Sequence, residues 1–421
     1  MSTSIAQQRL QVGLGHFKFN LDAQLATVIL ALLVIGYVML TSASIHLGGQ
    51  PDLAVNLHYS IMQLIHIVVG LVLAAIAASL TLSFWRKATP WLFLFGIFLL
   101  LIVFIPGVGT TVKGGMRWIA VAGLRLQVSE PFKLFVILAM AGFISKNPDK
   151  VTGSIWGFIR SNRWESIPKA ITSPYGLLFI CCALLMAQRN FGATAIVMAV
   201  TFGMFFIAGM RIGIFLIGFT VVSIMGTLLV MISPYRMKRV TGFLDPFADP
   251  SGDGYQIIQA LISYVNGGWF GVGLGSGVQK MYFLPEAHTD FLFSVVGEEL
   301  GFAGMLVIIL LYIVLVWRVF SIAMMAQRNG NQFAAMLTYG IGIWLGLQSF
   351  INMGVNMGML PPKGLTLPLM SYGGTSILMT LVSLGLVFRV FHETTEDENE
   401  TSHSDEFSIY GRSGEASWKR E

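Results

Sequence analysis

The sequence is short of charge. Of its 421 residues, 26 are Lys or Arg and 21 are Asp or Glu, so only 11% are charged, while 55% are hydrophobic. A soluble domain has about a quarter of its residues charged, and this chain has too little polar surface to cover a water-soluble fold. The composition therefore excludes a cytosolic enzyme, a nucleic-acid-binding protein and a secreted disulfide-rich domain, and it predicts a polytopic integral membrane protein.

Cysteine and the common catalytic motifs are also scarce. Cys181 and Cys182, the two cysteines of the sequence, are adjacent inside an apolar run. Neighbouring side chains of a helix point about 100° apart, so we do not expect these two to form a disulfide with each other. The sequence contains no zinc-ligand spacing, Walker loop, serine nucleophile elbow or sustained heptad repeat.

Apolar runs long enough to cross a bilayer are abundant. A helical crossing needs about 20 mostly apolar residues, and the sequence predicts an all-α bundle of about ten such spans. They are residues 22–44, 58–80, 89–106, 130–145, 174–188, 192–210, 213–233, 290–317, 334–356 and 370–390. The long run of residues 176–232 counts as three spans because Arg189, Asn190 and Arg211 interrupt it.

The predicted organisation is one membrane domain between two polar ends. Residues 1–20 are expected to be a cytoplasmic segment without a cleavable signal peptide, and residues 21–390 form the ten-span domain. Residues 234–289 make a large periplasmic loop between the seventh and eighth spans. Residues 391–421 predict a disordered cytoplasmic tail, because nine acidic and three basic residues lie from Glu393 onward.

The distribution of Lys and Arg predicts the orientation. With both termini inside, 16 of the 26 basic residues fall on the inner side, in the direction of the positive-inside rule. The other ten gather in outer segments, which favours a site for an anionic ligand at the outer leaflet. The alternative is that long loops cross the membrane regardless of their charge.

The strongest candidate for chemistry is the outer motif Pro-Glu-Ala-His-Thr-Asp at residues 285–290. Glu286 and Asp290 are four residues apart and share one face if the turn is helical. A half-desolvated carboxylate there can serve as a general base, whereas the simpler interpretation is a helix N-cap. Glu298 and Glu299 follow inside the span. The sequence is equally consistent with a structural ion pair and with a catalytic role for these two residues.

The same outer loop holds two other features. Residues 255–265 predict a short amphipathic helix lying on the membrane. The glycine-rich residues 267–277 either expose backbone N–H groups to a phosphate or form a turn. Glycine suits both purposes, so its presence does not indicate a phosphate site, and we favour the turn.

Other candidates lie outside this loop. Glu130 and Lys133 are three residues apart at the start of the fourth span and are expected to neutralise each other. Arg117, beside Trp118, can clamp a phosphate oxygen. Residues 361–376 interrupt two spans with prolines and glycines, and such broken backbone at membrane depth is tolerated only where it lines protein or a cavity.

These motifs together resemble those of the SEDS family (shape, elongation, division and sporulation), the ten-span polymerases of bacterial cell-wall glycan. The resemblance covers about residues 21–390. Its division branch has Pro-Glu-Ala-His-Thr-Asp and Lys-Gly-Leu-Thr-Leu-Pro, as found at residues 285–290 and 363–368. Its elongation branch usually has Arg after Pro-Glu and lacks that lysine. Gln127–Glu130 and Arg189–Ala193 depart from the family pattern, and no role is carried over to the second stretch.

The resemblance implies polymerisation of lipid II into β-1,4 glycan, with Asp290 as the catalytic base. Inversion at the α-linked donor in one displacement follows from the product. The implied contacts to substrate come from charged and polar residues, namely Arg117, Lys280, Glu286, His288, Lys363 and Ser371. The implied structural groups of the cavity are Glu130, Lys133, Glu298 and Glu299. A divalent cation, Mg²⁺ or Mn²⁺, is the candidate cofactor, and its ligands are not predicted.

The resemblance also implies partners and a location. The expected partners are lipid II, a monofunctional class B penicillin-binding transpeptidase and other membrane proteins of the division machinery. The expected location is the bacterial cytoplasmic membrane at the division septum. Two rival functions stay open. A lipid II flippase fits broken helices and intramembrane acids, and a non-catalytic scaffold of the division machinery would only recruit the transpeptidase.

Overall fold

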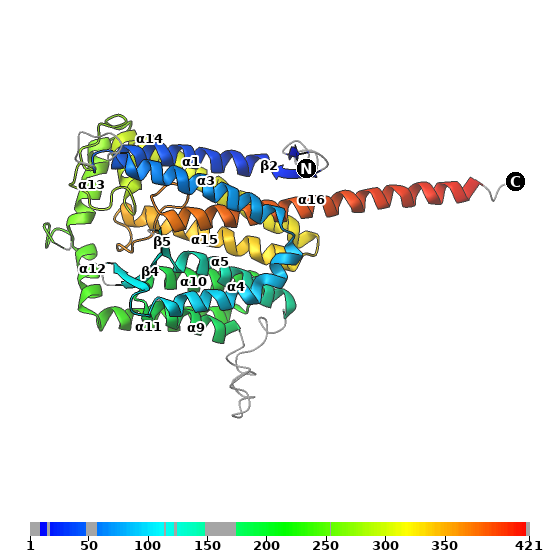
Figure 1. Cartoon of the computed structure of the whole chain (residues 1–421), viewed down its shortest axis with the longest axis horizontal. Coiled ribbons are helices and arrows are strands. Elements are labelled where there is room, and N and C mark those ends of the chain that lie inside the picture. The colour runs from blue at the N-terminus through cyan, green and yellow to red at the C-terminus, as the bar shows by residue number, and fades with distance from the viewer. Residues whose placement is uncertain are drawn as a thin grey trace, which may run out of the picture.

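The computed structural model describes residues 9–14, 17–47, 57–112, 115–121, 124–147, 174–252 and 254–417. The long helices lie side by side along the long axis of the molecule (Figure 1). α12 (Pro234–Leu244) and α13 (Tyr255–Gly267) lie across one end, which we call the outer end after the predicted topology. The N-terminal strands and the projecting part of α16 (Gly374–Ser417) lie at the opposite, inner end.

Within the described residues, six helices are long and apolar enough to cross a membrane, judged by length and composition. They are α1 (Ala23–Ser44), α3 (His58–Ser79), α4 (Leu82–Ile102), α14 (Leu292–Arg328), α15 (Gln332–Asn356) and α16 as far as Glu396. The other predicted spans correspond to α5 (Ser129–Lys146), α9 (Pro174–Ala187), α10 (Phe191–Ile207) and α11 (Ile212–Met231). The helical, polytopic fold class is confirmed, whereas the number of ten crossings stays a prediction.

Burial separates central helices from peripheral ones. Most of α15 and the first part of α16 is buried, whereas α3 and α4 turn apolar side chains such as Trp91 and Leu94 outward. Such exposure suits a helix that faces lipid rather than water. α3 and α16 approach closely because Gly385 has no side chain, and a Cβ atom there would lie 2.4 Å from the carbonyl oxygen of Ala74.

In the part of the chain that the structure describes, two small antiparallel sheets accompany the helices. β1 (Arg9–Leu14) pairs with β2 (Phe17–Asp22), and β3 (Gly109–Val112), β4 (Gly115–Val121) and β5 (Leu124–Gln127) form a second sheet in chain order. The pattern of apolar runs does not predict these strands, because they lie in the polar segments between runs. β5 leads directly into α5, and the N–H of Gln127 donates to the hydroxyl of Thr375 at 3.1 Å, so the start of α5 is held against α16.

The boundaries of the third and eighth predicted spans shift. The third span begins at Leu82 rather than at residue 89, because the Thr81 hydroxyl accepts the N–H of Phe84 and caps the helix. α14 extends to Arg328 and is broken at Gly301, whose φ is 67°. Backbone groups that lose their helical partner at this break form hydrogen bonds with the glycine-rich loop instead. The N–H of Phe302, for example, donates to the Gly268 carbonyl at 2.9 Å.

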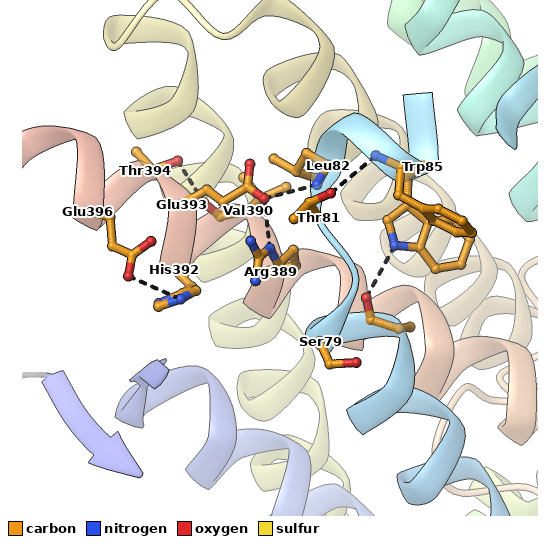
Figure 2. A network of polar contacts seen from close by, with 12 residues as sticks. Ser79, Thr81, Leu82, Trp85, Arg389, Val390, His392, Glu393, Thr394 and Glu396 are labelled. Atoms are coloured by element: carbon orange, nitrogen blue, oxygen red, sulfur yellow. Dashed lines mark hydrogen bonds and ion pairs between the residues drawn. The ribbon is translucent and has the colours of Figure 1, made fainter. Parts of the chain in front are cut away.

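The inner end is tied together by polar contacts around α16 (Figure 2). One carboxylate oxygen of Glu393 accepts both the Nε of Arg389 at 2.7 Å and the backbone N–H of Leu82 at 2.9 Å. Thr394 and Thr395 are also buried. The packed bundle therefore extends beyond the predicted boundary at residue 390.

The acidic segment beyond residue 390 is helical in the structure. α16 continues as one helix to Ser417 and leaves the bundle as a single projecting rod (Figure 1). Where the helix leaves the bundle, the buried His392 and the exposed Glu396 make an i,i+4 contact at 3.3 Å, which supports helix there. Disorder in the segment beyond Glu396 stays a prediction.

Candidate functional site

Asp290 lies in an irregular turn directly before α14. The carbonyl of Glu286 accepts the N–H groups of Thr289 and Phe291 at 3.1 and 3.2 Å, and the Thr289 hydroxyl donates to the Glu286 carboxylate at 2.8 Å. Glu286 has a φ of 58°. The prediction that Glu286 and Asp290 share a helical face is therefore wrong. The N-cap interpretation is wrong too, because α14 begins at Leu292 without a side-chain cap.

The carboxylate of Asp290 faces the backbone of the second conspicuous segment, residues 361–373, which connects α15 to α16. A Cβ atom built on Gly364 would lie 3.4 Å from Asp290 Oδ2, and Gly364 has a φ of 64° that favours glycine. The neighbouring Lys363 is exposed at the surface. The surrounding protein nevertheless removes part of the water around its ammonium, and this desolvation lowers the pKa of Lys363 below the usual range. A half-buried carboxylate thus lies beside a segment that presents a cation.

A row of amide side chains on α15 holds both segments. Gln348, Asn352 and Asn356 follow at intervals of four residues, so they share one helix face, and all three are buried. The Asn352 side-chain nitrogen donates to the carbonyls of Asp290 at 2.9 Å and Leu365 at 2.6 Å. Asn356 donates to the Asp290 carbonyl at 2.8 Å. We call these three residues the amide ladder.

The amide ladder is not among the candidates predicted from the sequence. The available signal was three amide residues at a spacing of four inside an otherwise apolar span. Buried amides need hydrogen-bond partners, and in a membrane helix such partners come from the bundle interior. That spacing predicts a polar stripe facing inward, but it does not tell which carbonyls the stripe holds.

Glu130 and Lys133 form the ion pair that their spacing predicts, with Lys133 Nζ 3.0 Å from Glu130 Oε2. Lys133 also donates to the Gln348 side-chain oxygen at 2.8 Å and lies over the Trp344 ring. Gln348 in turn donates to the Thr366 carbonyl at 2.9 Å. The buried pair on α5 is therefore linked through the amide ladder to the segment that carries Lys363.

Ser371 and His288 lie where this segment meets the turn of Asp290. The N–H of Tyr372 donates to the His288 carbonyl at 3.0 Å. The His288 ring packs against Tyr59 of α3 with ring centres 4.7 Å apart, and Tyr59 also contacts Tyr372. Ser371 is buried, and its hydroxyl accepts the N–H of Leu367 at 3.0 Å. Ser371 thus shapes the segment, while His288 joins an aromatic cluster.

Lys280 and Glu299 form a separate cluster at the outer end of α1. Lys280 Nζ lies 2.5 Å from Glu299 Oε1 and donates to the Ser42 hydroxyl at 2.7 Å. The Lys280 side chain is only 2% exposed, so the structure gives it a buried carboxylate partner rather than an open surface. Burial and the Lys280 charge together lower the pKa of the nearby His46.

The glycine-rich loop turns its N–H groups toward acidic side chains of the same chain. The N–H of Gly275 donates to Glu299 at 3.1 Å, and those of Val278 and Gln279 donate to Glu298 at 3.0 and 3.1 Å. Of the two interpretations of this loop, the turn is therefore supported. The phosphate cradle is not, because carboxylates of α14 occupy these donors.

Arg117 extends from β4, and its carbonyl accepts the N–H of Val128 at 3.3 Å, just before Glu130. Its guanidinium covers Gly115, where a Cβ atom would lie 2.5 Å from Arg117 Nε. Lys113, its neighbour in the motif, lies outside the described residues. Glycine at 115 therefore leaves room for the arginine side chain.

Known proteins with similar sequences carry a functional name. A protein of Methylococcus capsulatus named probable peptidoglycan glycosyltransferase FtsW is 50% identical over 379 residues, which are 90% of this chain and 92% of that protein. A protein of Methylomonas methanica with the same name is 44% identical, covering 90% and 94% of the two chains.

Solved structures are similar as well. A chain from a peptidoglycan synthase complex that coordinates polymerization and crosslinking has a TM-score of 0.71 and 29% identity, covering 89% of this chain and 98% of that one. The rod shape determining protein RodA of Thermus thermophilus has a TM-score of 0.61 and 26% identity, covering 89% and 97%. Residues 23–396 match the family model FTSW_RODA_SPOVE, described as cell cycle protein. This chain therefore belongs to the FtsW, RodA and SpoVE family of cell cycle proteins, the SEDS family.

Proposed function

We propose that this protein is a peptidoglycan glycosyltransferase that polymerises lipid II into β-1,4-linked glycan strands. The observation that carries the proposal is the approach of the Asp290 carboxylate to Gly364, beside Lys363. A base and a cation on two clamped segments are what the transfer of a sugar from a pyrophosphate needs. The names of the relatives support the same activity.

In the proposed reaction Asp290 is the general base. The 4-hydroxyl of the acceptor sugar gives its proton to the Asp290 carboxylate, and its oxygen forms a bond to the anomeric carbon of the donor. The bond from that carbon to the pyrophosphate oxygen breaks, and undecaprenyl pyrophosphate leaves with the electron pair. Attack opposite the leaving group inverts the α-linked donor to a β-1,4 product.

Cations are proposed to stabilise the charge that develops on the departing pyrophosphate. Lys363 and Arg117 are the proposed phosphate contacts, and Glu286 and His288 are the proposed polar contacts to the sugars. We assign Lys280 no phosphate contact, because its ammonium is buried against Glu299. Glu130, Lys133, Glu298 and Glu299 keep the structural roles predicted for them. Ser371, predicted as a substrate contact, is assigned a structural role instead, because its hydroxyl accepts the Leu367 N–H.

A divalent cation is a separate part of the proposal. Among the residues that the structure describes, no group of three or more His, Cys, Asp or Glu side chains comes together to hold a metal ion. An ion held entirely by protein ligands does not fit these residues. Mg²⁺ or Mn²⁺ held between one carboxylate and the substrate's phosphates would fit them, and no step of the reaction above depends on it.

The proposed setting is the bacterial cytoplasmic membrane at the division septum, with both termini in the cytoplasm. The proposed partners are a class B penicillin-binding transpeptidase and other membrane proteins of the division machinery. Similarity to a peptidoglycan synthase complex supports the transpeptidase. The residues that match the division branch, Ala287 and Lys363, support the septal role.

The test is polymerisation of fluorescent lipid II by the purified protein with its transpeptidase partner, read as glycan length on a gel. Asp290→Asn is expected to abolish the product. Asp245→Asn is the matched control, since Asp245 is an exposed carboxylate of the same outer loop. An active Asp290→Asn protein would rule out this base. Transport of lipid II across sealed vesicles without glycan formation would favour the flippase instead.

A further inference from the structure

Asn352 of α15 touches both segments that carry the proposed catalytic groups. Its side-chain nitrogen donates to the carbonyl of Asp290 at 2.9 Å and to the carbonyl of Leu365 at 2.6 Å. A side-chain amide nitrogen has two hydrogens, so each segment receives one. We propose that Asn352 is a positioning residue that sets the distance between the base Asp290 and the cation Lys363; this inference rests on the proposed function.

The segment of Lys363 depends on such external contacts. Residues 361–367 have no regular secondary structure, so helical or sheet hydrogen bonds do not fix their position. Their backbone is held by side chains instead: Asn352 bonds the Leu365 carbonyl, Gln348 bonds the Thr366 carbonyl, Ser371 bonds the Leu367 N–H and Arg239 bonds the Pro362 carbonyl. Of these four side chains, Asn352 is the one that also bonds the Asp290 carbonyl.

Asn356 makes different contacts, so the link between the two segments is tested at Asn352. Asn356 also donates to the Asp290 carbonyl, but its side-chain oxygen accepts the N–H and hydroxyl of Ser294 at 3.1 and 3.0 Å. It therefore anchors the turn to the first residues of α14. Asn352 instead joins the turn to the segment of Lys363, so its loss separates two groups that act on one substrate.

An amide is the side chain that suits position 352. Asn352 is 2% exposed, and the two carbonyls that it holds would lose a donor if it were apolar. Leucine has a similar volume but no donor, and aspartate has a similar shape but only acceptors when ionised. Glutamine keeps both hydrogens on a longer stem and should restore part of the clamp.

The consequence for catalysis is a loss of alignment rather than of binding groups. Displacement of a catalytic group by about 1 Å is enough to lower a rate by roughly 100-fold. We expect Asn352→Leu to lower kcat of lipid II polymerisation by at least about tenfold. KM should change by less than about threefold, because every proposed substrate contact is still present.

The experiment is a double-mutant comparison in the full-length protein with its transpeptidase partner, using fluorescent lipid II. Asn352→Leu is measured in the native background and in a Lys363→Met background. If Asn352 acts by placing Lys363, its substitution should lower kcat far less once Lys363 is gone. Equal losses in the two backgrounds, or full activity of Asn352→Leu, would overturn the inference.

Two further variants separate positioning from general damage. Thr338→Val is the matched control, because Thr338 is buried in the same helix and bonds only the Ala334 carbonyl of that helix in the described contacts; it should keep native kcat. Asn352→Gln should be more active than Asn352→Leu. If Asn352→Leu does not fold, Asn352→Asp is taken through the same comparison. The proposed function fails on a separate result: a native protein that makes no glycan from lipid II would refute it, whereas native glycan synthesis with a fully active Asn352→Leu variant would overturn only this inference.

Discussion

The ammonium of Lys280 lies 2.5 Å from a carboxylate oxygen of Glu299, and neither side chain is more than 2% exposed. The Ser42 hydroxyl contacts both groups, which connects α1 to α14 and to the outer loop. A buried pair of this kind is sensitive to the loss of one partner, because the other charge is then left without compensation. The pair therefore supports the outer end of the bundle and is not free to bind substrate.

The first prediction concerns this pair. Lys280→Met is expected to lower the free energy of unfolding by about 3–5 kcal/mol, since the Glu299 carboxylate stays buried alone. The double variant Lys280→Met/Glu299→Gln should recover part of that loss. Thermal unfolding in one detergent measures both, with the exposed Lys238→Met as control. A Lys280→Met protein of native stability with weakened lipid II affinity would return Lys280 to the phosphate contacts.

The second prediction concerns Gly364, whose φ is 64°. Alanine in this left-handed conformation costs roughly 1–2 kcal/mol. Its Cβ would also lie 3.4 Å from Asp290 Oδ2, inside the proposed site. Gly364→Ala is therefore expected to lose both stability and at least about tenfold in polymerisation rate.

Gly330→Ala is the control for this prediction. Gly330 has a φ of 78°, and a Cβ atom there would meet nothing within 4 Å. It lies in the turn between α14 and α15, at the inner end. The two alanine variants should lose similar stability in thermal unfolding, but Gly330→Ala should keep its activity. Equal activities would mean that Gly364 serves only the backbone.

The spans could be predicted from the sequence because each apolar run is long enough to decide its own structure. Asp290 could be singled out because Glu286, His288 and Asp290 bring three titratable groups within five residues at a membrane boundary, and because their motif resembles that of the SEDS family. The amide ladder was not predicted, because the role of Asn352 depends on the carbonyls of Asp290, 62 residues earlier, and Leu365, 13 residues later, to which it donates in the folded chain. The glycine-rich loop was left open for the same reason, because its carboxylate partner Glu298 is 20 residues from Val278.

The third prediction concerns the network at the inner end (Figure 2). Glu393→Ala removes the acceptor of both Arg389 and the Leu82 N–H, so the start of α4 loses its link to α16. We expect a loss of about 1–2 kcal/mol in the free energy of unfolding. Polymerisation at the outer end should not change. Glu396→Ala is the control, because its side chain is 52% exposed and its pairing with His392 should contribute little.

A Glu393→Ala protein that unfolds like the native one would show that the contact of Glu393 with Leu82 does not support α4. A loss of polymerisation with native stability would be the more informative contradiction. It would mean that the inner end is coupled to Asp290, which the contacts of the described residues do not require. Thermal unfolding and the lipid II assay, run on the same preparation, distinguish these outcomes.

The last prediction concerns pH. Partial burial lowers the pKa of Lys363, and a lysine binds phosphate as its ammonium form. Its contribution is complete at a pH below that pKa and is lost as the pH rises through it, earlier than for an ordinary lysine with a pKa of about 10.4. Arginine stays charged throughout this range. Lys363→Arg should therefore move the alkaline limit of polymerisation to higher pH, even if its rate at neutral pH is lower.

The measurement is the initial rate of lipid II polymerisation from about pH 6 to about pH 10, which brackets the titration of a lysine with a lowered pKa. Lys238→Arg is the matched control, because Lys238 is an exposed lysine of α12 in the same outer loop and should leave the profile unchanged. If Lys363→Arg and the native protein share one alkaline limit, Lys363 does not bind the departing pyrophosphate. That result would leave Asp290 in place and shift the search for the cation to Arg117.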